Sequence, residues 1–284
     1  PDPLGRELRA ARGVGEIFDL LGGRSPRAED VQLAHIALAL DRARELGLGP
    51  KVRAARGCRS FFRTAARLVE NGEASAAELR RVLEALAYVP GGEPMGTLAR
   101  RCADQFGRAL HGASPSDLAR ALWALAKLRL SAPAALPKRL ASECAQDAGV
   151  LEPSDVARLA WAAAKLVVRD DRVFAAVAAQ AAERTATFSL QGLSTCVWAC
   201  AAVRKYKADL FSAAAPRARA AITDDPLAAS PQSLANFAWA FAVVGPGRGD
   251  AALLGAIARV ASRGVSKFKA QELSMLVWAL AKSR

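Results

Sequence analysis

Five similar stretches of the chain carry hydrogen-bonding side chains at one fixed spacing. The first position of each stretch is Ser or Gln, the second lies four residues later and varies, and the third lies seven residues further on and is Lys in three stretches. Hydroxyl, amide and guanidinium groups pair with the edges of unstacked bases, and lysine pairs with phosphate, so this pattern predicts contacts with nucleic acid. The predicted contact residues are Ser116, Arg120, Lys127, Ser154, Arg158, Lys165, Gln191, Thr195, Gln232, Asn236, Gln271, Met275 and Lys282.

An exposed helix face that had merely become polar could show a similar composition, and this interpretation stays open. The restriction of the first position to Ser or Gln favours a surface that distinguishes bases. The first two stretches carry identical sets, Ser/Arg/Lys, so we expect both to prefer the same base, with guanine favoured because Arg and Ser can donate to its acceptor-rich edge.

The tryptophans show that these stretches belong to a repeat. All five lie within the similar words, at positions 123, 161, 198, 239 and 278, which gives a period of 37–41 residues. Two weaker copies precede them, one at Leu79 with Glu84 at the tryptophan position and one at Val31 with Ile36 at that position. The seven copies cover residues 29–282, with one irregular step of 48 residues. A fixed period of this size indicates stacked structural units.

Each copy begins as a helix should, and a second helical segment follows it. Ser114 and Ser230 are N-cap serines followed by proline, and Ser75 forms a capping box with Glu78. We name the helix with the recurring word helix A and the one after it helix B. The predicted fold is an all-α solenoid of about seven helix pairs, a single domain over residues 1–284. Residues 1–74 form degenerate N-terminal helices and the first repeat, and residues 75–284 form regular repeats, of which the last is incomplete.

The faces of helix A follow from a rotation of 100° per residue. One apolar stripe, which includes Leu118 and Leu122, should pack on helix B. Two positions are alanine in all seven copies and lie on opposite flanks, which predicts a neighbouring A helix on each side. The tryptophan lies beside the exposed front, where we expect it to pack between A helices, and a role as a stacking wall stays open. The two alanine sets are residues 37, 85, 124, 162, 199, 240 and 279, and residues 39, 87, 126, 164, 201, 242 and 281.

Composition and charge narrow the class of partner. The chain has 284 residues, is 52% hydrophobic and carries a net charge of +13, which favours nucleic acid first and an anionic membrane surface second. No apolar run is long enough for a membrane span. Residues 1–21 lack the apolar core of a signal peptide and begin without Met, so we expect a trimmed product whose targeting segment is missing.

Cysteines and histidines give little support for enzyme chemistry. Five cysteines is an odd number, and all lie in helical patterns, which predicts reduced thiols in an intracellular compartment. Cys196 and Cys200 share a helix face without further metal ligands nearby, so we expect apolar packing there. His35 and His111 have no catalytic partner at a recognisable spacing, and the Gly-rich segment 245–249 is interpreted as a linker. The sequence therefore predicts a protein that is not an enzyme and needs no cofactor or metal.

The recurring words "SPQSLANFAWAFA", "DLARALWALAKL" and "QELSMLVWALAK" resemble the signature helix of octotricopeptide repeats. These are helix-pair repeats of algal organelle proteins, related to the heptatricopeptide repeats of apicomplexan proteins with a RAP domain. The resemblance covers residues 75–284 well and 25–74 weakly. The proline-rich motif of the family is poorly kept, with "SAPAALPKRL" as its nearest match, and the 284 residues do not include a RAP domain. The final A helix lacks a partner, so we expect the protein to continue or to meet another chain.

The resemblance implies an organellar RNA-binding protein that acts in RNA stability, processing, translation or ribosome assembly. It places the protein in the mitochondrion ahead of the chloroplast. We therefore expect a sequence-preferring binder of single-stranded or ribosomal RNA, with organellar ribosomal or other proteins as further partners. The alternative is an architectural or protein-interaction solenoid, such as a structural component of an organellar ribosome that holds rRNA by shape and charge.

Overall fold

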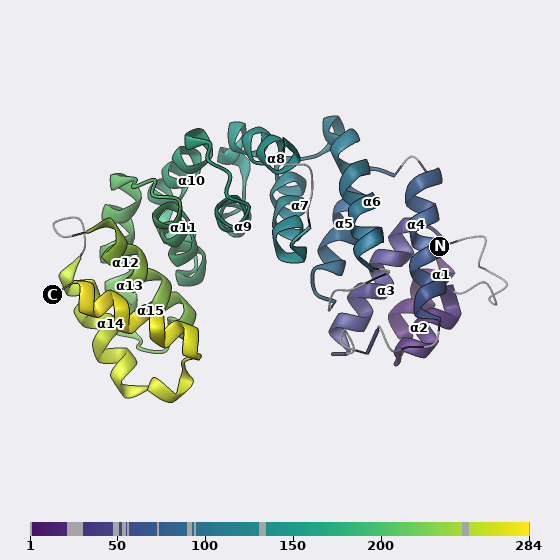
Figure 1. The fold of residues 1–284 in the computed structure, drawn as a ribbon. Coiled ribbons are helices and arrows are strands. Elements are labelled where there is room, and N and C mark those ends of the chain that lie inside the picture. Colours follow the sequence, from purple (N-terminus) through teal and green to yellow (C-terminus); the bar gives the residue numbers. More distant parts are fainter. Residues whose placement is uncertain are drawn as a thin grey trace. The chain divides into compact units, whose positions relative to one another are not determined.

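The computed structural model describes residues 2–21, 31–47, 51, 52, 55, 57–72, 74–89, 93, 95–130, 135–245 and 250–283. Every regular element in these ranges is a helix, so the all-α prediction is confirmed for the described part of the chain (Figure 1). The chain divides into two compact units, residues 1–137 and 138–284.

Unit 1 contains two rows of helices. Helices α1 (Pro3–Ala10), α3 (Leu33–Glu45), α5 (Ala76–Leu86) and α7 (Pro115–Leu128) each contact the next member of their row. Helices α2 (Val14–Leu21), α4 (Cys58–Asn71) and α6 (Met95–Arg108) form the second row, and α5 also packs on α6. The A helices predicted from the sequence are α3, α5 and α7.

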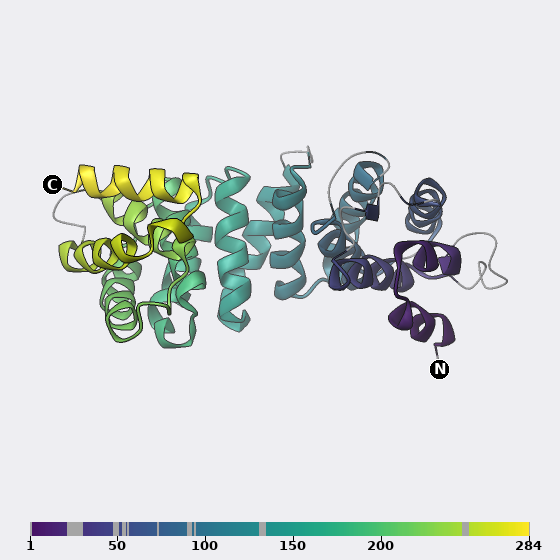
Figure 2. The same cartoon turned by 90° about the horizontal axis from the view of Figure 1, so that it is seen from below.

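Unit 2 repeats this arrangement with more regular helices. The A helices α9 (Pro153–Lys165), α11 (Leu190–Ala202), α13 (Pro231–Val244) and α15 (Ala270–Lys282) lie side by side in that order (Figures 1 and 2). The B helices α10 (Asp171–Glu183), α12 (Ala208–Asp224) and α14 (Ala251–Arg263) form the second row, and α8 (Ala135–Gln146) crosses the boundary between the units.

The predicted helix starts are present. The hydroxyls of Ser75, Ser114 and Ser230 accept hydrogen bonds from the third residue of α5, α7 and α13, and prolines occupy the first turn of α7 and α13. These caps satisfy backbone N–H groups that have no partner within the helix. Three A helices also end alike, because Arg129, Val167 and Arg204 take left-handed φ values of 51°, 55° and 58° just after α7, α9 and α11. A left-handed residue therefore occupies the same repeat position after each of these three helices.

The alanines that follow the tryptophan position are buried in all seven A helices, with exposed fractions of 3% or less. In α15 this residue is Ala279, which is fully buried although α13 is the A helix that α15 contacts, so this flank faces the preceding A helix. On the opposite flank Ala39, Ala126, Ala201 and Ala242 are buried, Ala87 and Ala164 are half-buried, and Ala281 in α15 is exposed. The small side chains thus allow A helices to approach closely, as the sequence predicted.

The five cysteines are buried thiols, and no disulfide joins them. Burial raises the pKa of Cys102, Cys144 and Cys200 to about 12, and it also raises the pKa of Cys196. Cys196 and Cys200 are both fully buried in α11, so the expectation that they pack as small apolar side chains is confirmed.

Candidate nucleic-acid interface

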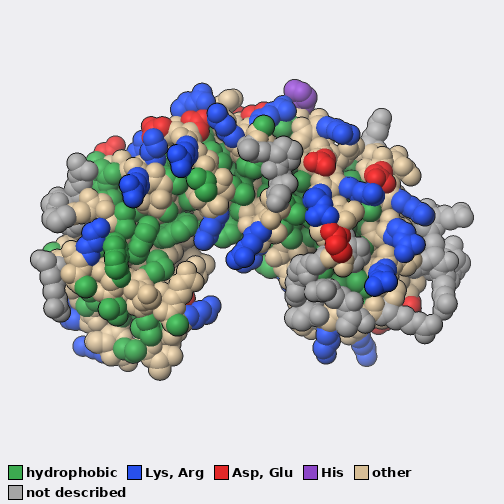
Figure 3. Space-filling view, in the orientation of Figure 1, with side chains coloured by type: hydrophobic (Ala, Val, Ile, Leu, Met, Phe, Trp, Pro, Cys, Tyr) green, Lys and Arg blue, Asp and Glu red, His purple; other side chains and the backbone are tan. Residues whose placement is uncertain are grey.

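None of the thirteen predicted contact residues is buried. Seven are exposed and six are half-buried, and all of them lie on A helices. The half-buried ones are Ser116 and Arg120 on α7, Arg158 on α9, Thr195 on α11, Asn236 on α13 and Met275 on α15. Lys and Arg side chains elsewhere are spread over the face shown in Figure 3 rather than gathered in one patch.

A hollow of about 210 Å³ in unit 2 brings five predicted residues together. These residues come from three different A helices and are Lys165, Gln232, Asn236, Gln271 and Met275. The hollow is also lined by Trp161, Trp198, Lys269 and Glu272. A concave site with a few convergent polar groups is the usual form of a ligand site.

Three amide side chains in this hollow are available to a ligand. Gln232, Asn236 and Gln271 make no side-chain hydrogen bond to any other residue in the described ranges. Each amide offers two donors and an acceptor. Lys165 and Lys269 supply positive charge, while the Glu272 carboxylate accepts a hydrogen bond from the Lys269 backbone N–H at 2.9 Å. The hollow can therefore donate to and accept from one small polar molecule.

Tryptophans form a continuous row beside the predicted contact residues. The ring centres of Trp198 and Trp239 lie 6.5 Å apart, and those of Trp239 and Trp278 lie 6.4 Å apart. Trp161, Trp198 and Trp239 are half-buried, and Trp278 is 43% exposed. The predicted packing between A helices is thus present, and part of each ring still faces solvent.

Lys165 connects two of these rings. Its Nζ lies 5.9 Å from the centre of the Trp161 ring and 5.3 Å from that of Trp198, both within the range of a cation–π contact. Lys282 lies over Trp278 in the same manner, at 4.8 Å. Two of the lysines predicted to meet phosphate are therefore held against aromatic faces.

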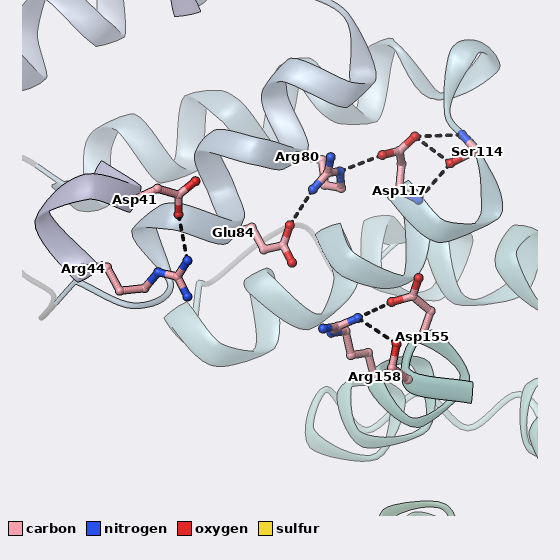
Figure 4. Close-up of polar contacts among 9 residues, drawn as sticks. Asp41, Arg44, Arg80, Glu84, Ser114, Asp117, Asp155 and Arg158 are labelled. Carbon is pink, nitrogen blue, oxygen red and sulfur yellow. Dashed lines mark hydrogen bonds and ion pairs between the residues drawn. The ribbon is translucent and has the colours of Figure 1, made fainter. Parts of the chain in front are cut away.

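Arg158 is held by the protein itself (Figure 4). Its guanidinium donates to Asp155, whose side chain is 1% exposed, and lies 3.4 Å from the Ser154 hydroxyl. If Arg158 turned to a base, the buried Asp155 carboxylate would lose this ion pair, which is costly. The sequence interpretation missed this pair, although the spacing of three residues along a helix could have revealed it.

Thr195 is also engaged within its own helix. Its hydroxyl donates to the backbone carbonyl of Gln191 at 2.8 Å, so its oxygen remains available only as an acceptor. Gln191 and Thr195 on α11 do not line the hollow. The predicted contact residues of α13 and α15 therefore line the same hollow as Lys165, whereas those of α11 do not.

In unit 1 the charged groups of the A helices pair with one another. Arg80 lies between Glu84 and Asp117, at 2.5 and 2.6 Å (Figure 4). Burial would raise the pKa of Asp117, but hydrogen bonds from Ser114 and Arg80 and the charge of Arg80 outweigh it, so this pKa lies below 3.8. Tyr88 contacts Trp123 at 5.4 Å and the Arg44 guanidinium at 4.7 Å. Lys127 of α7 is exposed.

Two charged residues, Lys269 and Glu272, line the hollow although they were not predicted as contacts. Lys269 precedes α15 and Glu272 lies in its first turn. Their positions at the start of the recurring word were visible in the sequence. Their proximity to Trp161 and Lys165 could not be seen in the sequence, because it depends on how α9, α11, α13 and α15 pack.

Other chemistry finds little support in the described part of the chain. No group of three His, Cys, Asp or Glu side chains there could hold a metal ion. His35 is buried, accepts a hydrogen bond from the Gln32 backbone and contacts Asp2 at 3.0 Å. Among the helices described, none has the length and apolar character needed to cross a membrane. The Gly-rich segment 245–249 lies mostly outside the described residues.

The sequence matches no known protein-family model and no curated protein sequence.

Proposed function

We propose that this protein is an α-solenoid of about seven helix pairs that binds single-stranded RNA along the exposed front of its A helices. The packing of α9, α11, α13 and α15 in sequence order, and of α3, α5 and α7 likewise, supports the solenoid. The resemblance of the recurring words to octotricopeptide repeats supports a role in organellar RNA stability, processing, translation or ribosome assembly.

One observation carries the proposal for RNA. The hollow in unit 2 presents two lysines, two tryptophans and three amides that have no hydrogen-bond partner in the described part of the chain. Base recognition in single strands uses these groups: amides for base edges, aromatic rings for stacking and cations for phosphate. The net charge of +13 adds attraction to a polyanion.

The proposal is tested by the salt dependence of binding to single-stranded RNA of mixed sequence. Each phosphate neutralised should contribute about 0.7 to the slope of log affinity against log salt. We expect a steep slope for the wild type. A variant with Lys127, Lys165 and Lys282 changed to Gln should lower the slope by about 2.

The matched control removes the same charge from the B helices. Arg219→Gln, Arg259→Gln and Arg263→Gln affect exposed residues of α12 and α14. This variant should keep more of the wild-type slope. If the wild type shows no salt dependence, or if both triple variants lose the slope equally, RNA binding along the front is refuted.

The paired arginines favour a second candidate, a scaffold that holds RNA or protein without distinguishing bases. Arg80 and Arg158 serve neighbouring carboxylates, so the guanidinium groups at these places support the fold. Selection from random RNA separates the two candidates. A scaffold would return sequences without a shared motif, whereas a reader would return one.

A further inference from the structure

The space between Trp161 and Trp198 differs from the rest of the tryptophan row. The next two intervals of the row contain direct contacts between indole rings, at 6.5 and 6.4 Å. Between Trp161 and Trp198 the ammonium group of Lys165 lies over both rings instead. This position opens into the hollow, because Trp161, Lys165 and Trp198 all line it.

A lysine held over two rings can give way to another group. The side chain is exposed and flexible, and it makes no ion pair with the described residues. A nucleobase stacks on an indole face with much more contact area than an ammonium group. The displaced ammonium group would then be free to meet the phosphate of the same nucleotide, with Lys269 available as a second cation.

The polar lining favours a particular kind of base. Gln232, Asn236 and Gln271 can each donate and accept in parallel, the geometry with which an amide pairs with adenine. The Glu272 carboxylate accepts hydrogen bonds and repels phosphate, so it suits an exocyclic amino group. Uracil lacks that amino group, and a purine stacks on an indole ring over a larger area than a pyrimidine does.

We propose that this hollow binds a single adenine nucleotide of RNA, with the base stacked on Trp161 and Trp198 in the place now held by Lys165. The amides of Gln232, Asn236 and Gln271 bind the base edge, and Lys165 and Lys269 bind the phosphate. This assignment rests on the proposed RNA binding and adds a specific position and base to it.

The test compares binding of the full chain to 12-nucleotide oligo(A) and oligo(U) by fluorescence anisotropy. The wild type should bind oligo(A) more tightly. Trp198→Leu should weaken oligo(A) binding by about tenfold to a hundredfold, the range expected for loss of one stacking contact. The control is Trp278→Leu, since Trp278 belongs to the same row but does not line the hollow, and its ring contact in the described ranges is with Trp239 rather than with Trp161 or Trp198. It should change affinity by less than about threefold, because no stacked base is lost.

A second pair of variants keeps the test decisive if the tryptophan variants unfold. Asn236→Leu removes an amide from the hollow, and Gln191→Leu removes one from α11 outside it. Asn236→Leu should abolish the preference for oligo(A) while Gln191→Leu retains it. Equal binding of both oligonucleotides by the wild type, or equal effects of the paired variants, would overturn the adenine site and leave general RNA binding intact. No binding of either oligonucleotide would refute the proposed function as well.

Discussion

The A helices of the two units share one sequence pattern but use it differently. In unit 1 the tryptophan position of α5 holds Glu84, which pairs with Arg80, and Arg80 reaches across to Asp117 of α7. In unit 2 the same position holds tryptophan in all four A helices, and the side-chain amides of Gln232, Asn236 and Gln271 on α13 and α15 make no hydrogen bond within the described residues. Similar helix packing can therefore leave polar groups satisfied in one unit and available in the other.

This difference indicates which interactions hold each row of A helices. Arg80 is 12% exposed and its two carboxylate partners are 21% and 17% exposed, so the pair with Glu84 within α5 and the pair with Asp117 of α7 are both largely shielded from water. In α11, Ser194, Val197 and Ala201 are buried at 0–2%, whereas the corresponding Ser274, Val277 and Ala281 of α15 are exposed. In unit 1 an ion pair thus links α5 to α7 in addition to the buried alanine flank that the A helices of both units share.

The largest expected effect concerns the flank of α11. Val197→Asp would bury an unpaired charge and should lower the free energy of unfolding by about 3–5 kcal/mol. Val277 occupies the same place in the same Ser/Val/Trp/Ala pattern of α15 but is 64% exposed, so Val277→Asp should cost less than about 0.5 kcal/mol. Urea unfolding followed by circular dichroism measures both. Similar costs for the two variants would contradict the assignment of the flank.

The next effect concerns the ion pairs of unit 1. Arg80→Met removes the shared partner of two shielded carboxylates and should cost about 2–3 kcal/mol. Its neighbour Arg81 is exposed, and Arg81→Met should cost less than about 0.5 kcal/mol. The same unfolding measurement applies. If Arg80→Met proves neutral, charge does not hold α5 against α7, and the contrast between the units disappears.

The alanine flanks should behave alike in both units. Ala124 of α7 and Ala162 of α9 are fully buried, so replacing either with leucine should cost about 1–3 kcal/mol by overpacking. Ala281→Leu on the exposed flank of α15 serves as the control and should have almost no effect. Thermal unfolding of the three variants decides the matter. A cost in one unit alone would show that close approach of A helices is not a shared feature.

The smallest effect is a dependence on pH. The lowered pKa of Asp117 means that its ionised form stabilises the folded state. That contribution is complete above the unfolded value near 3.8 and is lost as the pH falls through the folded pKa. Arg80→Met should therefore make stability less sensitive to pH between about 5 and 2 than in the wild type. Melting temperatures across this range test the expectation, and parallel curves for the two proteins would contradict it.

The sequence was sufficient to predict features that depend on one helix at a time. The period, the caps at Ser75, Ser114 and Ser230, and the buried alanine flank all follow from helical geometry along a single segment. Contacts between helices were harder, since they depend on how far one helix slides along its neighbour. Lys165 contacts the ring of Trp198 on the next A helix, and no residue spacing within α9 predicts that contact. The proposed RNA contacts remain predictions.

The buried thiols give each unit its own chemical reporter. Since only the thiolate reacts readily with alkylating reagents, cysteines with pKa values raised by burial should be nearly inert in the folded protein. Labelling would then occur when a helix opens, so its rate under mild conditions would report local unfolding. Cys102 would follow unit 1, and Cys196 and Cys200 would follow α11 beside the hollow. A molecule that binds between the A helices would slow the modification of α11 while leaving Cys102 to react at its former rate.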